Sequence, residues 1–340
     1  MWFDESRLDD ESALAGSDLL LRSLAESGAR VRRAAGDARE AIDEALRRSE
    51  GSRPRAVIAA GPDSRLLRAV LEPWCPVPFV AWPGPALPGW AGSLDLVVIL
   101  SPERSDPAAA SAVAEAVRRG CQVVVACQSD SMVAEHAAGR WSTILPIVSG
   151  DQLATAVVML DYLHRLGLGP ESDADEVATA LDDMAISCSP HRDIAINPAK
   201  MLAIGLADAN PLVWGGSVLA ARAARRVAES MRRASGRSAL AGDAEHLLPV
   251  LEATRARNVF DDPFADDGGE LRTVLLVLED GSDDQVGREQ RGRLLAAAES
   301  RGVRVETMAA ESGSEVARYA SLLLLGSYTA AYLQLALTTT

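Results

Sequence analysis

Short apolar runs that alternate with helical segments constrain this chain most. Such runs, rich in β-branched residues, indicate strands buried on both faces of a parallel sheet. In the first half they are RAVIAAG (55–61), VPFVAW (77–82), LDLVVIL (94–100), QVVVAC (122–127) and STILPI (142–147). Helices are predicted between them at 64–71, 107–119 and 131–138, whereas the proline-rich loop WPGPALPGW (82–90) is predicted to lack one. Together these segments predict one doubly wound α/β unit.

The same alternation returns after residue 210. Strands are predicted at 213–216, 272–280 and 303–310, with a weaker one at 238–242, and helices at 217–234, 283–301 and 313–337. The acidic, glycine-containing segment 254–270 is predicted to be a surface loop. The chain therefore contains two α/β halves of similar plan, although no sequence identity between them is visible.

Helical segments flank and join the two halves. Apolar residues recur at helical intervals over 9–49, with a break expected at Gly28, and helices are again predicted over 151–209. We therefore expect four parts: N-terminal helices (1–50), a first α/β subdomain (51–150), linking helices (151–210) and a second α/β subdomain with a C-terminal helix (211–340).

The charge balance excludes one class of partner. The formal net charge of −14 argues against a protein that binds nucleic acid by neutralising phosphates, and nothing suggests an anionic membrane. An acidic protein can still bind a phosphorylated small molecule through backbone amides and a few arginines.

Cysteine usage and the N-terminal residues indicate a cytoplasmic protein. The four cysteines form no CxxC pair and no histidine lies at zinc-like spacing, so no metal site is predicted. Cys121 and Cys127 are expected to be buried in a strand. The N-terminal residues show no secretory signal, and the apolar stretch 320–337 is interpreted as a buried helix rather than a membrane span.

One turn is a generic place to hold a phosphate. Gly215 and Gly216 end a short apolar run, and Ser217 is predicted to cap the helix that follows. Such a turn exposes backbone N–H groups at a helix N-terminus. The alternative is a tight turn that binds nothing, because most strand–glycine–helix turns have no ligand.

The segment NPAKMLAIGLADANPLVWGGSVLAARAARRVAES (197–230) closely resembles the middle of the bifunctional phosphoglucose/phosphomannose isomerases of the sugar isomerase (SIS) superfamily. The C-terminal ARYASLLLLGSYTAAYLQLAL (317–337) resembles the last long helix of that family. The actinobacterial, TobH-like SIS proteins are most similar, through the WPGPALPGW-type loop and the NPAK segment. The resemblance implies two flavodoxin-like SIS subdomains, each a five-stranded parallel sheet flanked by helices, and a homodimer.

The family chemistry is aldose–ketose isomerisation of a phosphosugar through a cis-enediol, without a metal or redox cofactor. The resemblance places the base at Glu229 and the ring-opening group at His246. The alternative for Glu229 is a solvated helix residue paired with Arg225 or Arg233. His246 lies in GDAEHLLPVLE, which departs from the family's PExxHN-like loop, so an ordinary helix residue is the alternative.

The resemblance also suggests phosphate and sugar ligands, namely Ser101, Ser105, Gly215, Gly216, Ser217 and Lys200. The turns of the first half differ from the family's pattern: one reads AAGPDS (59–64) and the next SPERSD (101–106). Glu103 and Asp106 put carboxylates where a phosphate would dock. Lys200 could instead pair locally at a helix N-terminus.

Two classes of function remain open from the sequence. The first is an enzyme, a glucose/mannose 6-phosphate isomerase with Glu229 as base. The second is a carbohydrate-derivative-binding SIS protein without catalysis, which senses a sugar phosphate or acts as a dimeric scaffold for a partner enzyme. A scaffold without any ligand is a third, simpler possibility.

Overall fold

The chain forms two compact units. The computed structural model describes residues 2–49, 53–254, 271–310 and 312–338. Residues 28–178 form one unit, here called the inserted unit, and residues 1–27 with 179–340 form the other, the terminal unit. Each is described by itself. The four-part division expected from the sequence stays a prediction.

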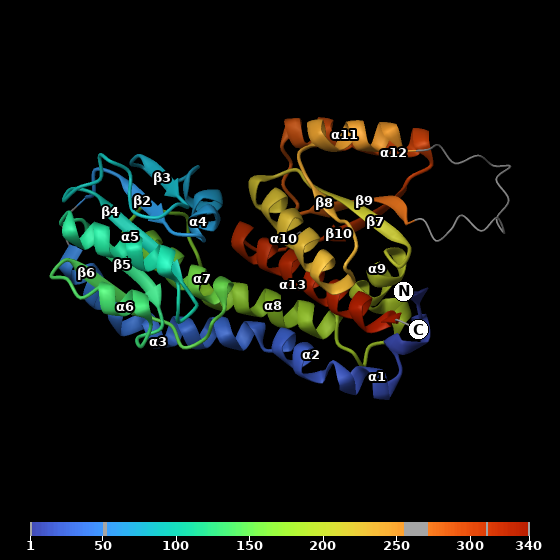
Figure 1. The fold of residues 1–340 in the computed structure, drawn as a ribbon, viewed down its shortest axis with the longest axis horizontal. Helices are drawn as coiled ribbons and strands as arrows, with labels where there is room; N and C mark the ends of the chain where they lie inside the picture. The colour runs from blue at the N-terminus through green and yellow to red at the C-terminus, as the bar shows by residue number, and fades with distance from the viewer. Residues whose placement is uncertain (1, 50–52, 255–270, 311, 339–340) are drawn as a thin grey trace, which may run out of the picture. The chain divides into compact units, whose positions relative to one another are not determined.

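The inserted unit is built on a five-stranded parallel sheet in the order β3-β2-β4-β5-β6 (Figure 1). Its strands are β2 (Val57–Ala60), β3 (Phe79–Trp82), β4 (Leu96–Ser101), β5 (Gln122–Cys127) and β6 (Ser142–Pro146). All five coincide with the predicted runs. The order is that of a doubly wound fold, which places a topological switch point between β2 and β4.

Helices cover both faces of this sheet. One face carries α5 and α6 and the other carries α4 and α7. The bounds are α3 (Ser27–Ser49), α4 (Ser64–Leu71), α5 (Pro107–Arg118), α6 (Met132–His136) and α7 (Gln152–Arg165). Alanines and valines of α5 pack against β4 and β5 in a core that includes Cys121 and Cys127, as predicted. The loop 82–90 contains no helix, also as predicted.

The terminal unit repeats this plan with four parallel strands in the described residues. Their order is β10-β9-β7-β8, so the switch point lies between β7 and β9. The strands are β7 (Ala209–Gly215), β8 (Leu240–Ala241), β9 (Arg272–Glu279) and β10 (Arg304–Ala309). The resemblance implied five strands in this sheet. The expected loop over 254–270 lies, from residue 255 on, outside the described residues.

Two helix layers enclose the second sheet (Figure 1). On one face α10 packs against β7 and against α13, while α11 and α12 pack together on the other. The helices of this unit are α8 (Ala174–Ser187), which begins in the inserted unit, α9 (Pro198–Gly205), α10 (Val218–Ser235), α11 (Ala244–Ala253), α12 (Gln285–Arg301) and α13 (Glu315–Ala336), with the 3₁₀ turn η2 (Ile194–Ile196). Most residues of α13 are buried, as expected for the C-terminal apolar helix.

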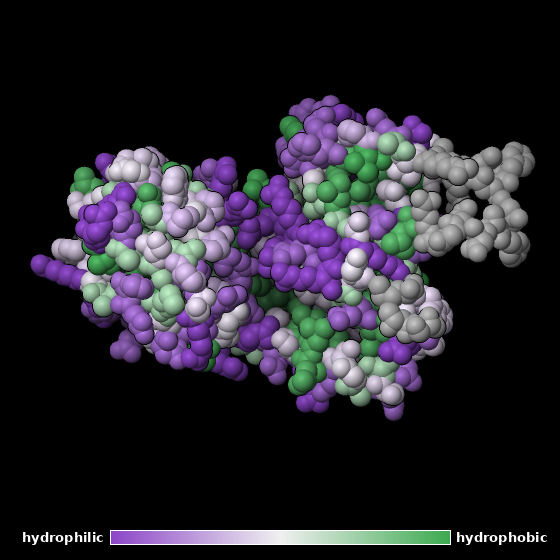
Figure 2. All heavy atoms as spheres, viewed as in Figure 1, coloured by the Kyte–Doolittle hydropathy of each residue, from purple (hydrophilic) through white to green (hydrophobic). Residues whose placement is uncertain are grey.

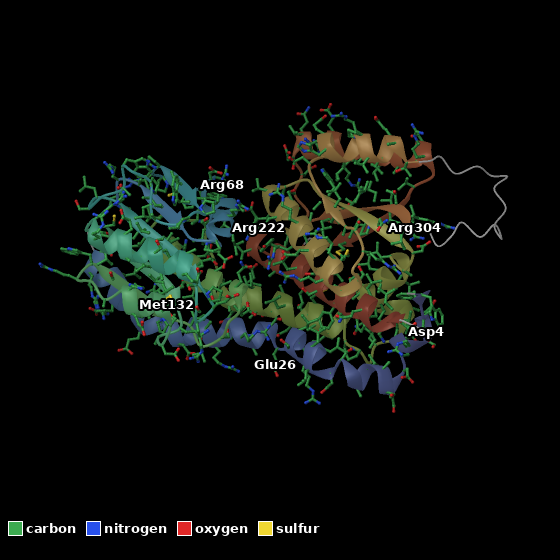
Figure 3. The ribbon with its side chains drawn as sticks, viewed as in Figure 1. Asp4, Glu26, Arg68, Met132, Arg222 and Arg304 are labelled. Atoms are coloured by element: carbon green, nitrogen blue, oxygen red, sulfur yellow. The ribbon has the colours of Figure 1, made fainter. Side chains whose placement is uncertain are left out.

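The N-terminal segment closes onto the C-terminal helix. Strand β1 (Trp2–Phe3) pairs antiparallel with β11 (Leu337–Thr338). The backbone N–H of Asp4, labelled in Figure 3, donates to the carbonyl of Ala336 at 2.9 Å, and Arg7 Nε donates to the carbonyl of Leu335. The short η1 (Glu5–Leu8), α1 (Glu11–Gly16) and α2 (Asp18–Ala25) follow.

The expected helix break at Gly28 is wrong by two residues. The helical segment is interrupted at Ser17 and at Glu26, and Gly28 lies inside the first turn of α3. A glycine is tolerated there because N–H groups of a first helical turn have no intrahelical partner in any case. Of the helices in the described ranges, none combines the length and the apolar character needed to cross a membrane.

Candidate functional site

The switch point of the terminal unit is occupied by a serine–aspartate pair. Ser217 follows β7, caps α10 by accepting from the N–H of Ala220 at 2.9 Å, and donates its own hydroxyl hydrogen to Asp280. Asp280 lies at the end of β9 and is only 8% exposed. Its other carboxylate oxygen accepts from the N–H of Ser282 at 3.2 Å.

The Ser217–Asp280 pair bears on the phosphate interpretation of this turn. The positive end of the 18-residue helix α10 already faces the buried carboxylate of Asp280. Gly215 and Gly216 are needed for close packing, since a methyl group on Gly215 would collide with the backbone of Ala220. A phosphate at this turn would meet the negative charge of Asp280, which opposes its binding.

Glu229 is the twelfth residue of α10 and lies between two arginines. Its Oε2 is 2.8 Å from Arg226 Nη1 and its Oε1 is 2.5 Å from Arg233 Nη2. The side chain is 30% exposed, whereas both arginines are more exposed. Hydrophilic side chains gather along the visible face of α10 in Figure 2. The carboxylate is therefore accessible once an arginine side chain moves.

Ser217 and Glu229 cannot contact the same hexose phosphate within this unit. Both belong to the one helix α10 and its cap. Twelve residues at a rise of about 1.5 Å each separate them by about 18 Å along the axis. With carbon–carbon bonds of about 1.5 Å, an extended hexose phosphate spans roughly half that distance. If Glu229 is the base, the phosphate is held elsewhere.

His246 lies on the surface of α11. Its side chain is 80% exposed, and Nδ1 is 3.9 Å from the carboxylate of Asp243. This distance is too long for a hydrogen bond, so Asp243 does not fix the orientation of the imidazole ring.

Lys200 is fully buried in the terminal unit. Its ammonium lies 2.5 Å from Asp9 Oδ1 and donates to the carbonyls of Pro190 and Arg192 at 2.8 and 3.1 Å. These three bonds use all three N–H donors of a lysine. Tyr332 covers the ammonium with its ring, 5.6 Å away.

In the inserted unit, Ser101 is the last residue of β4, and Ser105 lies in the turn that follows. Ser101 is fully buried, and its hydroxyl lies 3.5 Å from the carbonyl of Glu103, at the limit of a hydrogen bond. Ser105 is exposed. Asp106 caps α5 by accepting from the N–H of Ala109 at 2.9 Å, so a carboxylate occupies this helix N-terminus.

The turn after β2 contains further candidate phosphate ligands that the sequence did not single out. Ser64, the first residue of α4, is 1% exposed, and no described residue forms a hydrogen bond with its Oγ. Arg65 follows it and is exposed. A methyl group on Gly61 would lie 3.7 Å from Ala109, so the turn after β2 and helix α5 approach closely. The AAGPDS motif contained this serine, but its burial could not be seen in the sequence.

Two buried serines therefore mark the switch point of the inserted unit. Ser64 lies after β2, and Ser101 ends the neighbouring strand β4. Buried hydroxyls without a good partner are uncommon and need an explanation, such as a ligand that supplies the missing bond. As for metals, the described residues contain no group of three or more histidine, cysteine, aspartate or glutamate side chains that could hold an ion.

Comparison with known proteins places this fold. Residues 195–338 match the family described as the bacterial phospho-glucose isomerase C-terminal SIS domain. No curated protein matches the chain. Among solved structures, tagatose-6-phosphate ketose/aldose isomerase from Escherichia coli is similar with a TM-score of 0.65 and 14% identity over 92% of this chain and 93% of that one.

Two further structures share the fold. The C-terminal domain of glucosamine-fructose-6-phosphate aminotransferase from Francisella tularensis has a TM-score of 0.63 and 10% identity, covering 93% of this chain and 94% of that one. A glucose-6-phosphate isomerase like protein from Thermus thermophilus has a TM-score of 0.55 and 18% identity, covering 96% of this chain and 92% of that one.

The chain thus shares the fold of these phosphosugar isomerase structures over most of its length. Residues 195–338 are similar to the C-terminal SIS domain of the bacterial phosphoglucose isomerases.

Proposed function

We propose that this protein binds a hexose 6-phosphate and isomerises it between the aldose and ketose forms. Glucose 6-phosphate, mannose 6-phosphate and fructose 6-phosphate are the proposed substrates. The observation that carries the binding part is the pair of buried hydroxyls, Ser64 and Ser101, at the switch point of the inserted unit.

The phosphate is assigned to this switch point on chemical grounds. Ligands of doubly wound sheets bind outside the carboxyl ends of the strands where the strand order reverses. Ser64 and Ser101 supply hydroxyl donors, Ser105 adds an exposed one, and Arg65 supplies positive charge. Asp106 opposes the phosphate, because its carboxylate already caps α5. Lys200 and Ser217 are left out, since their donors are used within the terminal unit.

Independently of the phosphate site, the resemblance proposes Glu229 as the base that moves the proton between C2 and C1. As the proton leaves C2, negative charge develops on the carbonyl oxygen. A guanidinium that turns from Glu229 to this oxygen stabilises the charge and frees the carboxylate to act. The ion pairs of Arg226 and Arg233 with Glu229 support this proposal. His246 is the proposed ring-opening group.

Thermal melting tests the binding part. Each of the three hexose 6-phosphates is added at millimolar concentration, with inorganic phosphate as the control. A ligand at a hundred times its dissociation constant adds about 2.7 kcal/mol of stability. Ser64→Ala and Ser101→Ala are expected to reduce the sugar-dependent shift, whereas Ser111→Ala, an exposed serine of α5, leaves it unchanged. No shift with any hexose phosphate contradicts the proposal.

A coupled isomerase assay tests the catalytic part. Loss of a general base lowers kcat by about 10²- to 10⁴-fold, which is the effect expected for Glu229→Gln. Glu115→Gln is the matched control, because Glu115 also pairs with two arginines at i+3 and i+4 of a helix. Binding without turnover in the unaltered protein leaves the alternative, a phosphosugar-binding SIS protein without catalysis.

We also propose a homodimer, because the resemblance to the phosphosugar isomerases implies one. The apolar helix α13 is already buried within its own unit, so it does not by itself provide the interface. Light scattering coupled to size-exclusion chromatography gives the mass, and a monomer at micromolar concentration contradicts this part.

A further inference from the structure

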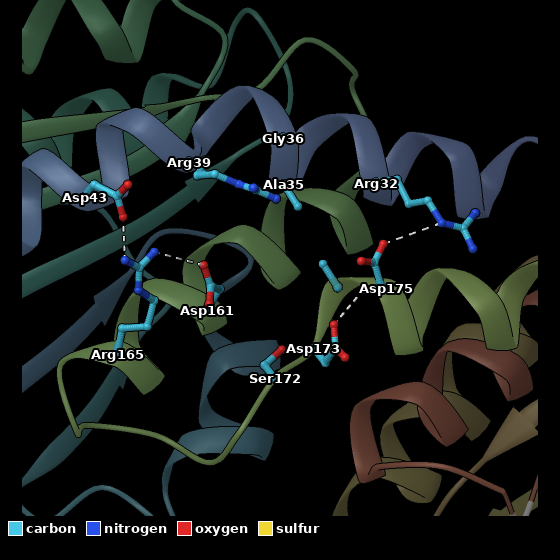
Figure 4. A pocket seen from close by; sticks show the side chains of 11 residues that line it. Arg32, Ala35, Gly36, Arg39, Asp43, Asp161, Arg165, Ser172, Asp173 and Asp175 are labelled. Carbon is cyan, nitrogen blue, oxygen red and sulfur yellow. Dashed lines mark hydrogen bonds and ion pairs between the residues drawn. The ribbon is translucent and has the colours of Figure 1, made fainter.

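In the inserted unit, α3, α7 and the beginning of α8 surround a polar cavity of about 360 Å³, whose lining does not include Ser64 or Ser101. Figure 4 shows its lining, in which Arg39 comes from α3, Asp161 from α7 and Ser172 from the segment before α8. The volume is within the range of small-molecule sites, which begins at about 300 Å³. The lining is rich in arginine and aspartate, so the cavity is suited to a charged ligand.

Most charges of the lining neutralise one another. Arg165 forms an ion pair with Asp43, and Arg32 lies 3.7 Å from Asp175. Arg39 makes no ion pair with any described residue. Figure 4 draws no interaction on it. One cation of the cavity is thus left without an anion in contact.

The carboxylate of Asp161 also lacks a close ionic partner. Asp161 has only a distant ion pair, 3.9 Å from Arg165 Nη1, and no described residue donates a hydrogen bond to it. Burial raises the pKa of Asp161, and the charges of Arg165 and, more weakly, Arg39 offset part of that effect. Asp173 also lines the cavity, where its carboxylate accepts from the N–H of Asp175 and makes no ion pair with a described residue. The cavity therefore presents one unpaired arginine and two carboxylates without a close ion pair.

Ser172 is an independent sign of a ligand. It is 6% exposed, it lines the cavity, and no described residue forms a hydrogen bond with its Oγ. It stands two residues before α8, whose N-terminus already has the carboxylate of Asp173 accepting from the N–H of Asp175 at 2.9 Å. An anionic ligand group would find a hydrogen-bond donor in Ser172 and a positive charge in Arg39.

We propose that this cavity binds a small zwitterion of the α-amino acid type. The ligand carboxylate accepts from the Arg39 guanidinium and from the Ser172 hydroxyl, and the ligand ammonium contacts Asp161. A simple anion leaves Asp161 without a partner and is repelled by it, and a simple cation meets Arg39 in the same way. A zwitterion is the class that pairs both groups at once.

Calorimetric titration of the full-length protein tests this site, with the common α-amino acids at millimolar concentration as probes. Acetate and methylamine, which carry one charge each, are the comparison ligands. At least one amino acid is expected to bind at least ten-fold more tightly than either. Arg39→Met, Asp161→Asn and Ser172→Ala are each expected to weaken that binding several-fold. Arg33→Met, an exposed arginine of α3 outside the cavity, is the matched control.

Three results would overturn the proposal. The first is that no amino acid binds. The second is that acetate binds as tightly as the amino acids, which would make this a plain anion site. The third is that binding is indifferent to all three substitutions, which would place the ligand elsewhere. Hexose phosphate binding at Ser64 is measured with different ligands and variants, so the two proposals succeed or fail separately.

Discussion

The buried ammonium of Lys200 lies 2.5 Å from the carboxylate of Asp9, although 191 residues separate the two in the chain. The lysine side chain is fully buried and the aspartate is half-exposed. Asp9 belongs to the N-terminal segment that pairs with the C-terminal helix. The counter-charge of a lysine in the NPAK segment therefore comes from a distant part of the sequence.

Asp9→Asn is expected to destabilise the protein by about 1–3 kcal/mol, because it leaves a buried ammonium without its charged partner. Urea unfolding measures the change. Asp37→Asn, an exposed aspartate of α3, is the control and is expected to stay within about 0.5 kcal/mol. Equal effects of the two variants would show that the Asp9 contact does not stabilise the fold.

Gly326→Ala is expected to destabilise the terminal unit by about 1–3 kcal/mol through overpacking of α13 against α10. The added methyl group would collide with Val227 Cγ2 and lie 3.2 Å from Val227 Cβ. Gly292→Ala in α12 meets nothing within 4 Å, so it should stabilise the protein by about 0.5–1 kcal/mol. Thermal melting distinguishes the two, and Val227→Ala should rescue Gly326→Ala.

Tyr328→Phe is expected to be neutral or stabilising by about 1 kcal/mol in neutral solution. The Tyr328 hydroxyl is buried, and among the described residues it has no hydrogen-bond partner. Removing an unsatisfied buried hydroxyl removes its desolvation cost. A loss of more than about 1–2 kcal/mol, the size of a made hydrogen bond, would contradict this account.

Alkaline pH is expected to weaken the terminal unit. Burial raises the pKa of Tyr328 from 10.0 to about 12, and burial likewise raises that of Cys188 from 9.0 to about 12. Both folded pKa values exceed the unfolded ones, so the stability contribution is complete below about pH 9 and is lost as the pH rises toward 12. Urea midpoints across this range measure the decline. Tyr328→Phe should make it shallower, and an unchanged slope would contradict the assignment.

Asp280→Asn is expected to improve the binding of inorganic phosphate by about ten-fold, or 1.4 kcal/mol. The substitution removes the negative charge that faces the N-terminus of α10, while the amide oxygen can still accept from Ser217. Calorimetry measures the dissociation constant. Asp283→Asn removes an exposed carboxylate three residues away, which pairs with Arg288, and should change little. Unchanged phosphate binding in Asp280→Asn would show that this carboxylate does not block the turn.

The sheets were predictable because their strands are short, apolar runs buried on both faces. The runs 94–100 and 122–127 correspond to the neighbouring strands β4 and β5, which are buried as predicted. Helix ends were predicted less accurately. The sequence predicts that a helix is interrupted at Gly28, whereas the structure interrupts it at Glu26. A glycine is compatible with both a break and a first helical turn.

The candidate site was less predictable, because its features depend on contacts between distant segments. The Ser217–Asp280 pair joins residues 63 positions apart, and the burial of Ser64 depends on how α4 packs. The motif at Lys200 predicted a helix N-terminus correctly, but its partner at Asp9 left no signal in the local sequence. Whether Glu229 and His246 are catalytic stays a prediction.

Strand β1 pairs with residues 337–338, which follow the whole inserted unit in the sequence. During synthesis on the ribosome, residues 28–178 can complete their own sheet long before α13 emerges. Residues 1–27 must wait, with the carboxylate of Asp9 lacking the ammonium of Lys200, until α9 and then α13 leave the exit tunnel. The terminal unit is therefore assembled late, after the unit that interrupts it in the sequence.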